Sequence, residues 1–198
     1  MSVAAIVLAA GRGARFGAAR GKLLADYRGS PLARHAVEAA LASKASKTIV
    51  VTGHARGDVE QALAGLPVNF AHNLDFASGV ASSLRVGLAC AADSAGALIL
   101  LADMPGVGSA TLDLLIAAFE RAPGCAAVAP VYRGRRGNPV LLGGSLFASV
   151  ASLTGDEGAR GLLRARDGVI EIAVDDESVL IDIDTREDLT TALGRARP

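Results

Sequence analysis

Short apolar runs alternate along this chain with longer segments in which apolar residues recur at helical spacing. The short runs predict strands at Val3–Leu8, Thr48–Gly53, Val68–Ala71, Ala97–Ala102, Ala126–Val131 and Pro139–Leu142. The longer segments predict helices at Pro31–Ser43, Asp58–Leu63, Gly79–Ala92 and Thr111–Arg121. Ser30 is expected to cap the first helix, with Pro31 at the first helical position.

This alternation of strands and helices indicates the fold class. The run Ala97–Ala102 is apolar throughout, which is typical of a strand that is buried on both faces of a parallel sheet. We therefore predict an α/β fold, a three-layer α/β/α, Rossmann-like arrangement with a mostly parallel sheet. No linker or repeat interrupts the pattern, so residues 1–198 are expected to form a single domain.

Composition narrows the range of partners. The chain has 20 Lys and Arg against 20 Asp and Glu, so its formal charge of zero argues against a broad nucleic-acid or anionic-membrane surface. No apolar run has the length needed to cross a bilayer, and the start of the chain lacks a basic leader. We expect a cytoplasmic protein in which Cys90 and Cys125 are buried free thiols.

A glycine-rich, cationic loop follows the first predicted strand. It runs from Leu8 through Ala9, Ala10, Gly11, Gly13 and Arg15 to Lys22. Glycine leaves backbone N–H groups accessible to a ligand, and Arg and Lys supply charge against phosphate oxygens. The loop therefore predicts a site for a nucleoside triphosphate.

The spacing in this loop excludes two familiar phosphate motifs. Phe16 stands where the dinucleotide fingerprint G-x-G-x-x-G needs its third glycine, which argues against an NAD-dependent oxidoreductase. The stretch from Gly17 to Leu23 is one residue too short for a Walker P-loop, and Leu23 has no hydroxyl for magnesium.

Acidic residues follow two apolar runs elsewhere in the chain. Asp103 comes directly after Ala97–Ala102, and Asp182 and Asp184 follow Val179–Ile181, on one face if that stretch is extended. Acids that meet at one rim of the sheet suit Mg²⁺, which prefers one or two carboxylates together with substrate phosphates. Thr185 is expected to cap a last helix, and we expect residues 143–168 to lie over the active-site edge.

Three further acids, Asp175, Asp176 and Glu177, are expected in a solvated turn.

Six stretches in order resemble the MobA-like nucleotidyltransferases of molybdenum cofactor maturation, most closely the molybdenum cofactor cytidylyltransferase branch. These stretches are Leu8–Lys22, Gly79–Leu84, Leu101–Pro105, Gly137–Val140, Gly155–Arg160 and Asp182–Thr185. The resemblance implies the nucleotidyltransferase version of the predicted fold. It also implies Mg²⁺-dependent transfer of CMP from CTP to the terminal phosphate of molybdopterin, with release of pyrophosphate.

The resemblance also assigns roles to residues. Arg15 and Lys22 would contact the triphosphate, and Asp103 and Asp184 would bind Mg²⁺, with Asp182 as the substitute for Asp184. The implied second-substrate residues are Asn138, Asp156 and Arg160. The implied nucleotide-binding residues are Leu8, Ala9, Ala10, Gly11, Gly13, Arg15, Lys22, Gly79, Ser82 and Ser83.

Ala10, where the guanylyl branch has glycine, and the pair Ser82–Ser83 favour CTP over GTP. One departure concerns the lysine, because the family spacing from the Arg-Phe-Gly unit would select Arg20. We favour Lys22, since Leu23 and Leu24 continue the family pattern.

Three alternatives stay open. They are a GTP-using guanylyltransferase, a sugar-phosphate nucleotidyltransferase of the same fold, and a non-catalytic chaperone that delivers the molybdenum cofactor to an oxidoreductase.

Overall fold

The computed structural model describes residues 1–17, 21–156, 158–159, 163 and 168–194. Within these residues, one sheet has the strand order β10-β7-β9-β6-β1-β4-β5, with β8 paired to β7. A second, two-stranded sheet pairs β2 (Asp26–Tyr27) with β3 (Ser30–Pro31). The strands of the main sheet are β1 (Val3–Ala9), β4 (Lys47–Thr52), β5 (Asn69–His72), β6 (Gly96–Leu101), β7 (Ala127–Tyr132), β8 (Arg135–Arg136), β9 (Val140–Gly143) and β10 (Val169–Ala173).

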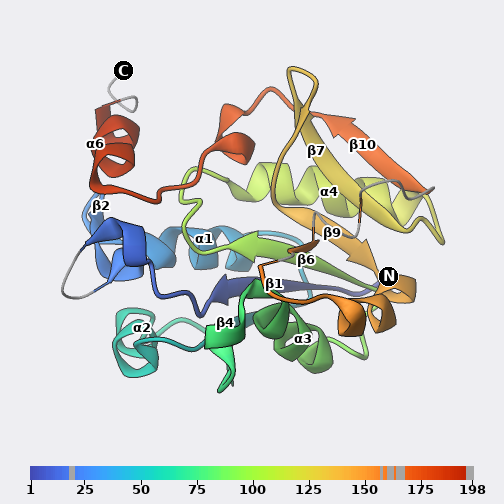
Figure 1. Cartoon of the computed structure of the whole chain (residues 1–198). Coiled ribbons are helices and arrows are strands. Elements are labelled where there is room, and N and C mark those ends of the chain that lie inside the picture. The colour runs from blue at the N-terminus through green and yellow to red at the C-terminus, as the bar shows by residue number, and fades with distance from the viewer. Residues whose placement is uncertain (18–20, 157, 160–162, 164–167, 195–198) are drawn as a thin grey trace.

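The main sheet is mostly parallel. The pairs β1·β4, β1·β6, β4·β5 and β7·β10 run parallel, whereas β9 runs antiparallel to β6 and β7, and β8 runs antiparallel to β7. Figure 1 shows α1 (Leu32–Leu41) and α4 (Ser109–Arg121) on one side of the sheet and α3 (Val80–Cys90) on the other. The predicted three-layer α/β fold is confirmed.

Two apolar clusters hold these layers together, and β1 contributes to both. Ala5 and Val7 pack with α1 and α4, while Ala4 and Ile6 pack with α3. Side chains alternate between the two faces of a strand, so an apolar strand covered by helices on both sides buries every position. The shorter α2 (Arg56–Ala62) follows β4 and precedes β5 along the chain, and α6 (Arg186–Gly194) is the last described helix.

The start of α1 differs from the prediction. Ser30 and Pro31 do not cap and begin the helix but form β3, where Tyr27 is opposite Ser30 and Asp26 is opposite Pro31. This pairing keeps Pro31 extended, with a ψ of 137°, and the helix begins at Leu32 without a side-chain cap. The pairing between strands therefore prevails over the local helix-start preference of Ser-Pro.

Two other predictions about burial were wrong. Cys90 is exposed at the last residue of α3, and Cys125 is half-buried, so burial raises the pKa of the Cys125 thiol. Of the three acids expected in a solvated turn, Asp175 and Glu177 are exposed, whereas Asp176 is half-buried. The Asp176 carboxylate accepts hydrogen bonds from Ser178 N (3.0 Å) and Thr111 Oγ1 (2.8 Å). It thereby fixes the 3-10 turn Glu177–Leu180 to α4.

The segment expected over the active-site edge divides into parts. Leu146, Val150 and Leu153 pack against α3 in the core, so this first part covers the sheet rather than the site. The next residue of interest, Asp156, lies at a cavity described below. Residues 157, 160–162 and 164–167 are outside the described part of the chain.

None of the helices described here combines the length and the apolar character that a membrane span requires.

Candidate nucleotide and metal site

Parallel pairing of β1 with β6 brings the glycine-rich loop next to Asp103. Leu8 is opposite Leu101 in this pair, and Ala102 N donates a hydrogen bond to Leu8 O at 3.2 Å. Both strands therefore end at the same edge of the sheet, where ligands bind in open α/β sheets. Residues 103 and 10 are distant in sequence but lie at one rim.

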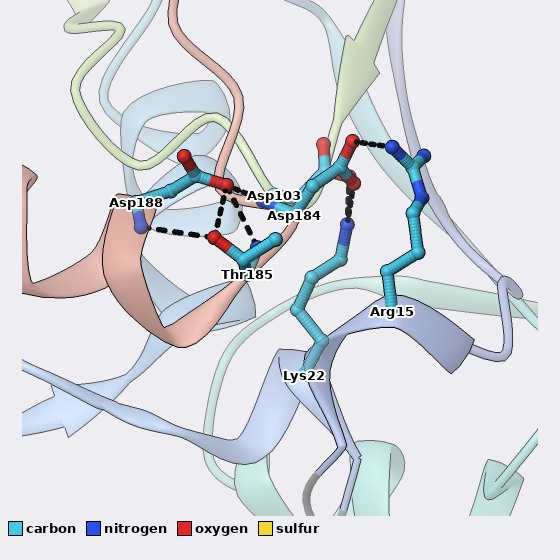
Figure 2. A network of polar contacts seen from close by, with 6 residues as sticks. All are labelled: Arg15, Lys22, Asp103, Asp184, Thr185 and Asp188. Carbon is cyan, nitrogen blue, oxygen red and sulfur yellow. Dashed lines mark hydrogen bonds and ion pairs between the residues drawn. The ribbon is translucent and has the colours of Figure 1, made fainter.

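At this rim Lys22 lies between two carboxylates. Its Nζ is 2.6 Å from Asp103 Oδ2 and 2.8 Å from Asp184 Oδ1. Arg15 Nη1 is 2.8 Å from the other oxygen of Asp184, Oδ2. Figure 2 shows the side chains of Arg15 and Lys22 pointing from the loop toward the two acids. The sequence prediction that these four residues meet at one place agrees with this geometry.

Backbone contacts hold the two acids together. Ile183 N donates to Asp103 O at 2.9 Å, which fixes the segment that carries Asp184 against the end of β6. Ile183 also packs with Phe16, Tyr27 and Leu32 in a small apolar cluster. Phe16 therefore anchors the glycine-rich loop, including Arg15, to the same cluster that positions Asp184.

The ion pairs keep Lys22 charged. Burial alone would lower the pKa of this ammonium, but the charges of Asp103 and Asp184 and their hydrogen bonds outweigh it, so the pKa of Lys22 is raised. A pKa raised by folding stabilises the folded state fully below the unfolded value of about 10.4. That contribution is lost as the pH rises through the folded pKa. Because the folded pKa lies above the ordinary lysine value, Lys22 is a cation throughout the neutral range.

The acid pair fits a divalent cation. Asp103 Oδ1 is buried and has no hydrogen-bond partner within the described residues, so no described protein donor satisfies this acceptor oxygen. No group of three or more His, Cys, Asp or Glu side chains in the described part of the chain is arranged to hold a metal. A pair of carboxylates suits Mg²⁺, which keeps several waters and binds substrate phosphates as well.

Gly13 allows the loop to pack closely against Lys22. It adopts a positive φ of 58°, and a Cβ at this position would lie 2.8 Å from Lys22 Cβ. Any larger residue would be strained in this conformation and would displace the lysine.

A cavity of about 320 Å³ opens beside the ion pairs. Its wall includes nine of the residues that the sequence analysis singled out: Leu8, Ala10, Gly11, Gly13, Lys22, Gly79, Ser83, Asp103 and Asp156. The cavity wall also includes residues that the sequence analysis missed, notably Arg12 and Phe76, whose side chains stack with Arg12 Cζ 5.6 Å from the ring centroid. No sequence pattern linked Arg12 to an aromatic residue 64 positions away.

The remaining predicted residues lie elsewhere. Ala9 is fully buried in the core and Ser82 does not line the cavity. Arg15 is exposed beside Asp184, outside the cavity wall. Asn138 lies against the turn Glu177–Leu180, where its N–H donates to Val179 O at 2.8 Å. Arg160 and Arg20 lie outside the described residues.

Of the two acids that the sequence left open, Asp184 is the one at the ion-pair cluster. Asp182 is exposed and lines a separate cavity of about 440 Å³ with Tyr27, Arg28 and Pro105. The intervening Ile183 is fully buried, and in an extended segment Asp182 and Asp184 would share the opposite face.

The start of α3 forms the opposite wall of the cavity. Gly79 has a φ of 104°, and a Cβ on it would lie 2.2 Å from Gly155 O, so no other residue fits. Gly155 O in turn accepts a hydrogen bond from Ala81 N at 3.1 Å. This contact fixes the segment before Asp156 to the first turn of α3.

Asp188 fixes the segment that carries Asp184. Its Oδ2 accepts hydrogen bonds from Asp184 N (3.1 Å), Thr185 N (2.8 Å) and Thr185 Oγ1 (2.8 Å). Asp188 N donates back to Thr185 Oγ1, so Thr185 caps α6 as predicted. The hydrogen bond from the Thr185 side chain is the main cause that lowers the pKa of Asp188.

Asp188→Ala is expected to lower the melting temperature by about 3 °C at neutral pH, because the capping box and the anchor of Asp184 are lost. A folded pKa that is lowered stabilises the fold above the unfolded value of about 4. The difference in melting temperature between wild type and variant should therefore shrink as the pH falls through the folded pKa of Asp188. Thermal melts between neutral pH and pH 3 test this, and a difference that stays constant at low pH would contradict the capping role.

The fold places the chain among proteins of known structure that include a nucleotidyl transferase. A nucleotidyl transferase from Methanothermobacter is 26% identical and superposes with a TM-score of 0.85 over 98% of this chain and 97% of that one. Rv0371c from Mycobacterium tuberculosis, solved in complex with manganese, is 28% identical with a TM-score of 0.83 over 100% of both chains.

The family described as the MobA-like NTP transferase domain matches residues 5–169. The chain belongs to this family. Among named relatives, nicotine blue oxidoreductase from Paenarthrobacter nicotinovorans is 35% identical to this chain over 94% of each protein.

Proposed function

We propose that this protein catalyses metal-dependent transfer of CMP from CTP to the terminal phosphate of a molybdopterin-type acceptor, with release of pyrophosphate. The observation that carries this proposal is the pair Asp103 and Asp184, which both bond the ammonium of Lys22 at the edge of a cavity of about 320 Å³. Glycine-loop backbone and the first turn of α3 line the same cavity. A bound triphosphate is stabilised by cationic side chains and by backbone N–H groups. Lys22 provides the first, and the glycine loop and the start of α3 are the segments that would provide the second.

The reaction needs no nucleophile from the protein. An oxygen of the acceptor phosphate attacks the α-phosphorus of the nucleotide, a new P–O–P bond forms, and the bond to the bridging oxygen of pyrophosphate breaks. The protein contributes position and charge neutralisation. Mg²⁺ bound by Asp103 and Asp184 would supply Lewis-acid stabilisation of phosphate charge.

Lys22 and Arg15 have the charge that the leaving pyrophosphate requires. Lys22 lies at the boundary between the acid pair and the cavity, and its ammonium is fixed by both carboxylates. Arg15 is 76% exposed, and its one ion pair within the described residues is with Oδ2 of Asp184, so it can turn toward an incoming triphosphate at little cost.

The choice of CTP and of a pterin acceptor depends on finer features. Ala10 lines the cavity where a guanylyl-type site would carry glycine, and its methyl group reduces the space for a purine. Asp156 approaches the cavity from the segment that resembles the family's second-substrate motif. We assign the reaction to the cytoplasm, where nucleoside triphosphates are found, and its product to a molybdenum-dependent oxidoreductase.

The test is a substrate screen with the purified protein. CTP, GTP, ATP and UTP are each incubated with Mg²⁺ or Mn²⁺ and molybdenum-loaded molybdopterin, and pyrophosphate release is followed. CTP is expected to give the fastest release, with none when the acceptor is omitted. Release with sugar phosphates instead would assign a different acceptor, and pterin binding without release would favour a cofactor chaperone.

A redox activity is the second candidate, because the relative from Paenarthrobacter is named an oxidoreductase and matches nearly the whole chain. Within the described residues, neither Cys90 nor Cys125 lines the cavity, so the electrons would have to come from a bound cofactor. Oxidation of reduced nicotinamide in the presence of nicotine blue, without added nucleoside triphosphate, would support this activity over nucleotidyl transfer.

A further inference from the structure

A buried amide lies behind the wall of the nucleotide cavity. Asn73 follows β5 and is only 2% exposed. Its backbone N–H donates to Thr52 O at 2.8 Å, so it continues the pairing of β5 with β4 beyond the last strand residue. A buried amide side chain must find partners for its carbonyl oxygen and its two N–H groups, and here the partners reveal its orientation.

The orientation of this amide is fixed by chemistry. Asp75 N lies 2.9 Å from Asn73 Oδ1, and a backbone N–H can only donate, so the carbonyl oxygen must face it. The Nδ2 group therefore faces the other way, 2.8 Å from Ser82 Oγ and 2.9 Å from Ser83 Oγ. Each serine oxygen thus accepts one of the two amide hydrogens.

The two serine hydroxyls then differ in what remains free. Ser82 Oγ donates its proton to backbone carbonyls, with Asp75 O at 2.9 Å and Gly79 O at 2.8 Å, and the residue is absent from the cavity wall. Ser83 lines the cavity, and within the described ranges its hydroxyl proton has no acceptor. Accepting a hydrogen bond from an amide also makes a hydroxyl a stronger donor.

We propose that Asn73 is a positioning residue that presents the Ser83 hydroxyl to the cavity as a hydrogen-bond donor. The site then selects a nucleotide that has an acceptor oxygen or nitrogen at this position, on the base or on the ribose. This inference rests on the proposed binding of a nucleoside triphosphate in the same cavity, and it adds the polarity that the nucleoside must have there.

The test uses equilibrium binding of CTP, measured by titration calorimetry, so that turnover is not needed. Ser83→Ala is expected to weaken CTP binding about tenfold, the effect of one lost hydrogen bond. Asn73→Asp is expected to do the same, because a carboxylate cannot donate and must instead accept the Ser83 proton. If the buried carboxylate prevents folding, Asn73→Ser replaces it in every comparison.

The double variant separates positioning from a merely structural role. If Asn73 acts through Ser83, Asn73→Asp adds nothing once Ser83 is Ala, and the double variant binds about tenfold more weakly than wild type rather than about a hundredfold. Ser78→Ala is the matched control, since this exposed hydroxyl in the same segment donates to Asp75 and to no other described residue. It should bind CTP as wild type does.

Comparison with 2′-deoxy-CTP tests one acceptor directly. An affinity ratio of CTP to 2′-deoxy-CTP that collapses to one in Ser83→Ala supports the proposal with the ribose 2′ oxygen as the acceptor, and an unchanged ratio supports it with an acceptor elsewhere on the nucleoside. Ser83→Ala binding CTP within twofold of wild type, or losses that multiply in the double variant, would overturn the proposal. Wild-type protein that binds no CTP would overturn both this inference and the proposed function.

Discussion

Asp103→Asn is expected to lower metal-dependent pyrophosphate release about 10³-fold. The substitution keeps the size of the side chain but removes a negative charge from a pair that must bind a divalent cation. It also changes the carboxylate whose buried Oδ1 has no hydrogen-bond partner within the described residues. Initial rates with increasing Mg²⁺ or Mn²⁺ measure the loss, and thermal melts verify that the variant folds.

A neighbouring pair of acids provides the control for this prediction. Asp184→Asn should lose activity to a comparable degree, because Asp184 bonds Lys22 opposite Asp103. Asp182→Asn changes the same charge two residues away, at the separate cavity, and should stay close to wild type. Equal losses of activity in Asp184→Asn and Asp182→Asn would show that the ion-pair cluster is not the metal site. An Asp103→Asn enzyme that keeps wild-type activity would show the same.

Lys22→Met is expected to lower triphosphate turnover about 10²-fold and at the same time to tighten the binding of a divalent metal in the absence of nucleotide. Methionine fills the space of the buried stem without its charge. The ammonium of Lys22 now neutralises both carboxylates, at 2.6 and 2.8 Å, so it competes with a metal for the same oxygens. Titration calorimetry with Mn²⁺ measures the binding and pyrophosphate release measures the turnover.

Arg20→Met is the matched comparison, because family spacing alone would give Arg20 the role assigned to Lys22. It should change neither metal binding nor turnover by more than a few-fold. A larger loss of turnover in Arg20→Met than in Lys22→Met would reassign the phosphate-binding cation. Weaker Mn²⁺ binding in Lys22→Met would contradict the competition between lysine and metal.

Sequence patterns predicted the strands of the sheet better than the elements at its edges. Strands such as Gly96–Leu101 are apolar at every position, a pattern typical of a strand that is buried on both faces of a sheet. The prediction of where α1 starts was wrong because Ser30 and Pro31 are compatible with both a helix cap and an antiparallel strand pair. Only the pairing with Asp26 and Tyr27 decides between the two. The exposure of Cys90 likewise depends on which face of α3 meets the sheet.

The site divides in the same way. The glycine loop, Asp103 and Lys22 carry local signals, because they directly follow an apolar strand or belong to a glycine-rich run. Asn73 and Phe76 carry none, since a single amide after a short strand or a single aromatic in a polar stretch has many ordinary explanations, and nothing in the loop around Arg12 points to Phe76 as its partner. Their partners are contributed by other segments of the chain.

The amino-acid order therefore determined, on its own, that this chain folds as an α/β sheet with a cationic glycine loop and acids at strand ends, because such features follow from periodicity and from the chemistry of neighbouring residues. Only the tertiary structure decided that Asp184 and not Asp182 shares Lys22 with Asp103, and that, within the described residues, Ser83 lines the cavity whereas Ser82 does not. Each of these depends on hydrogen bonds and packing between segments that are far apart in sequence, such as Ile183 N to Asp103 O.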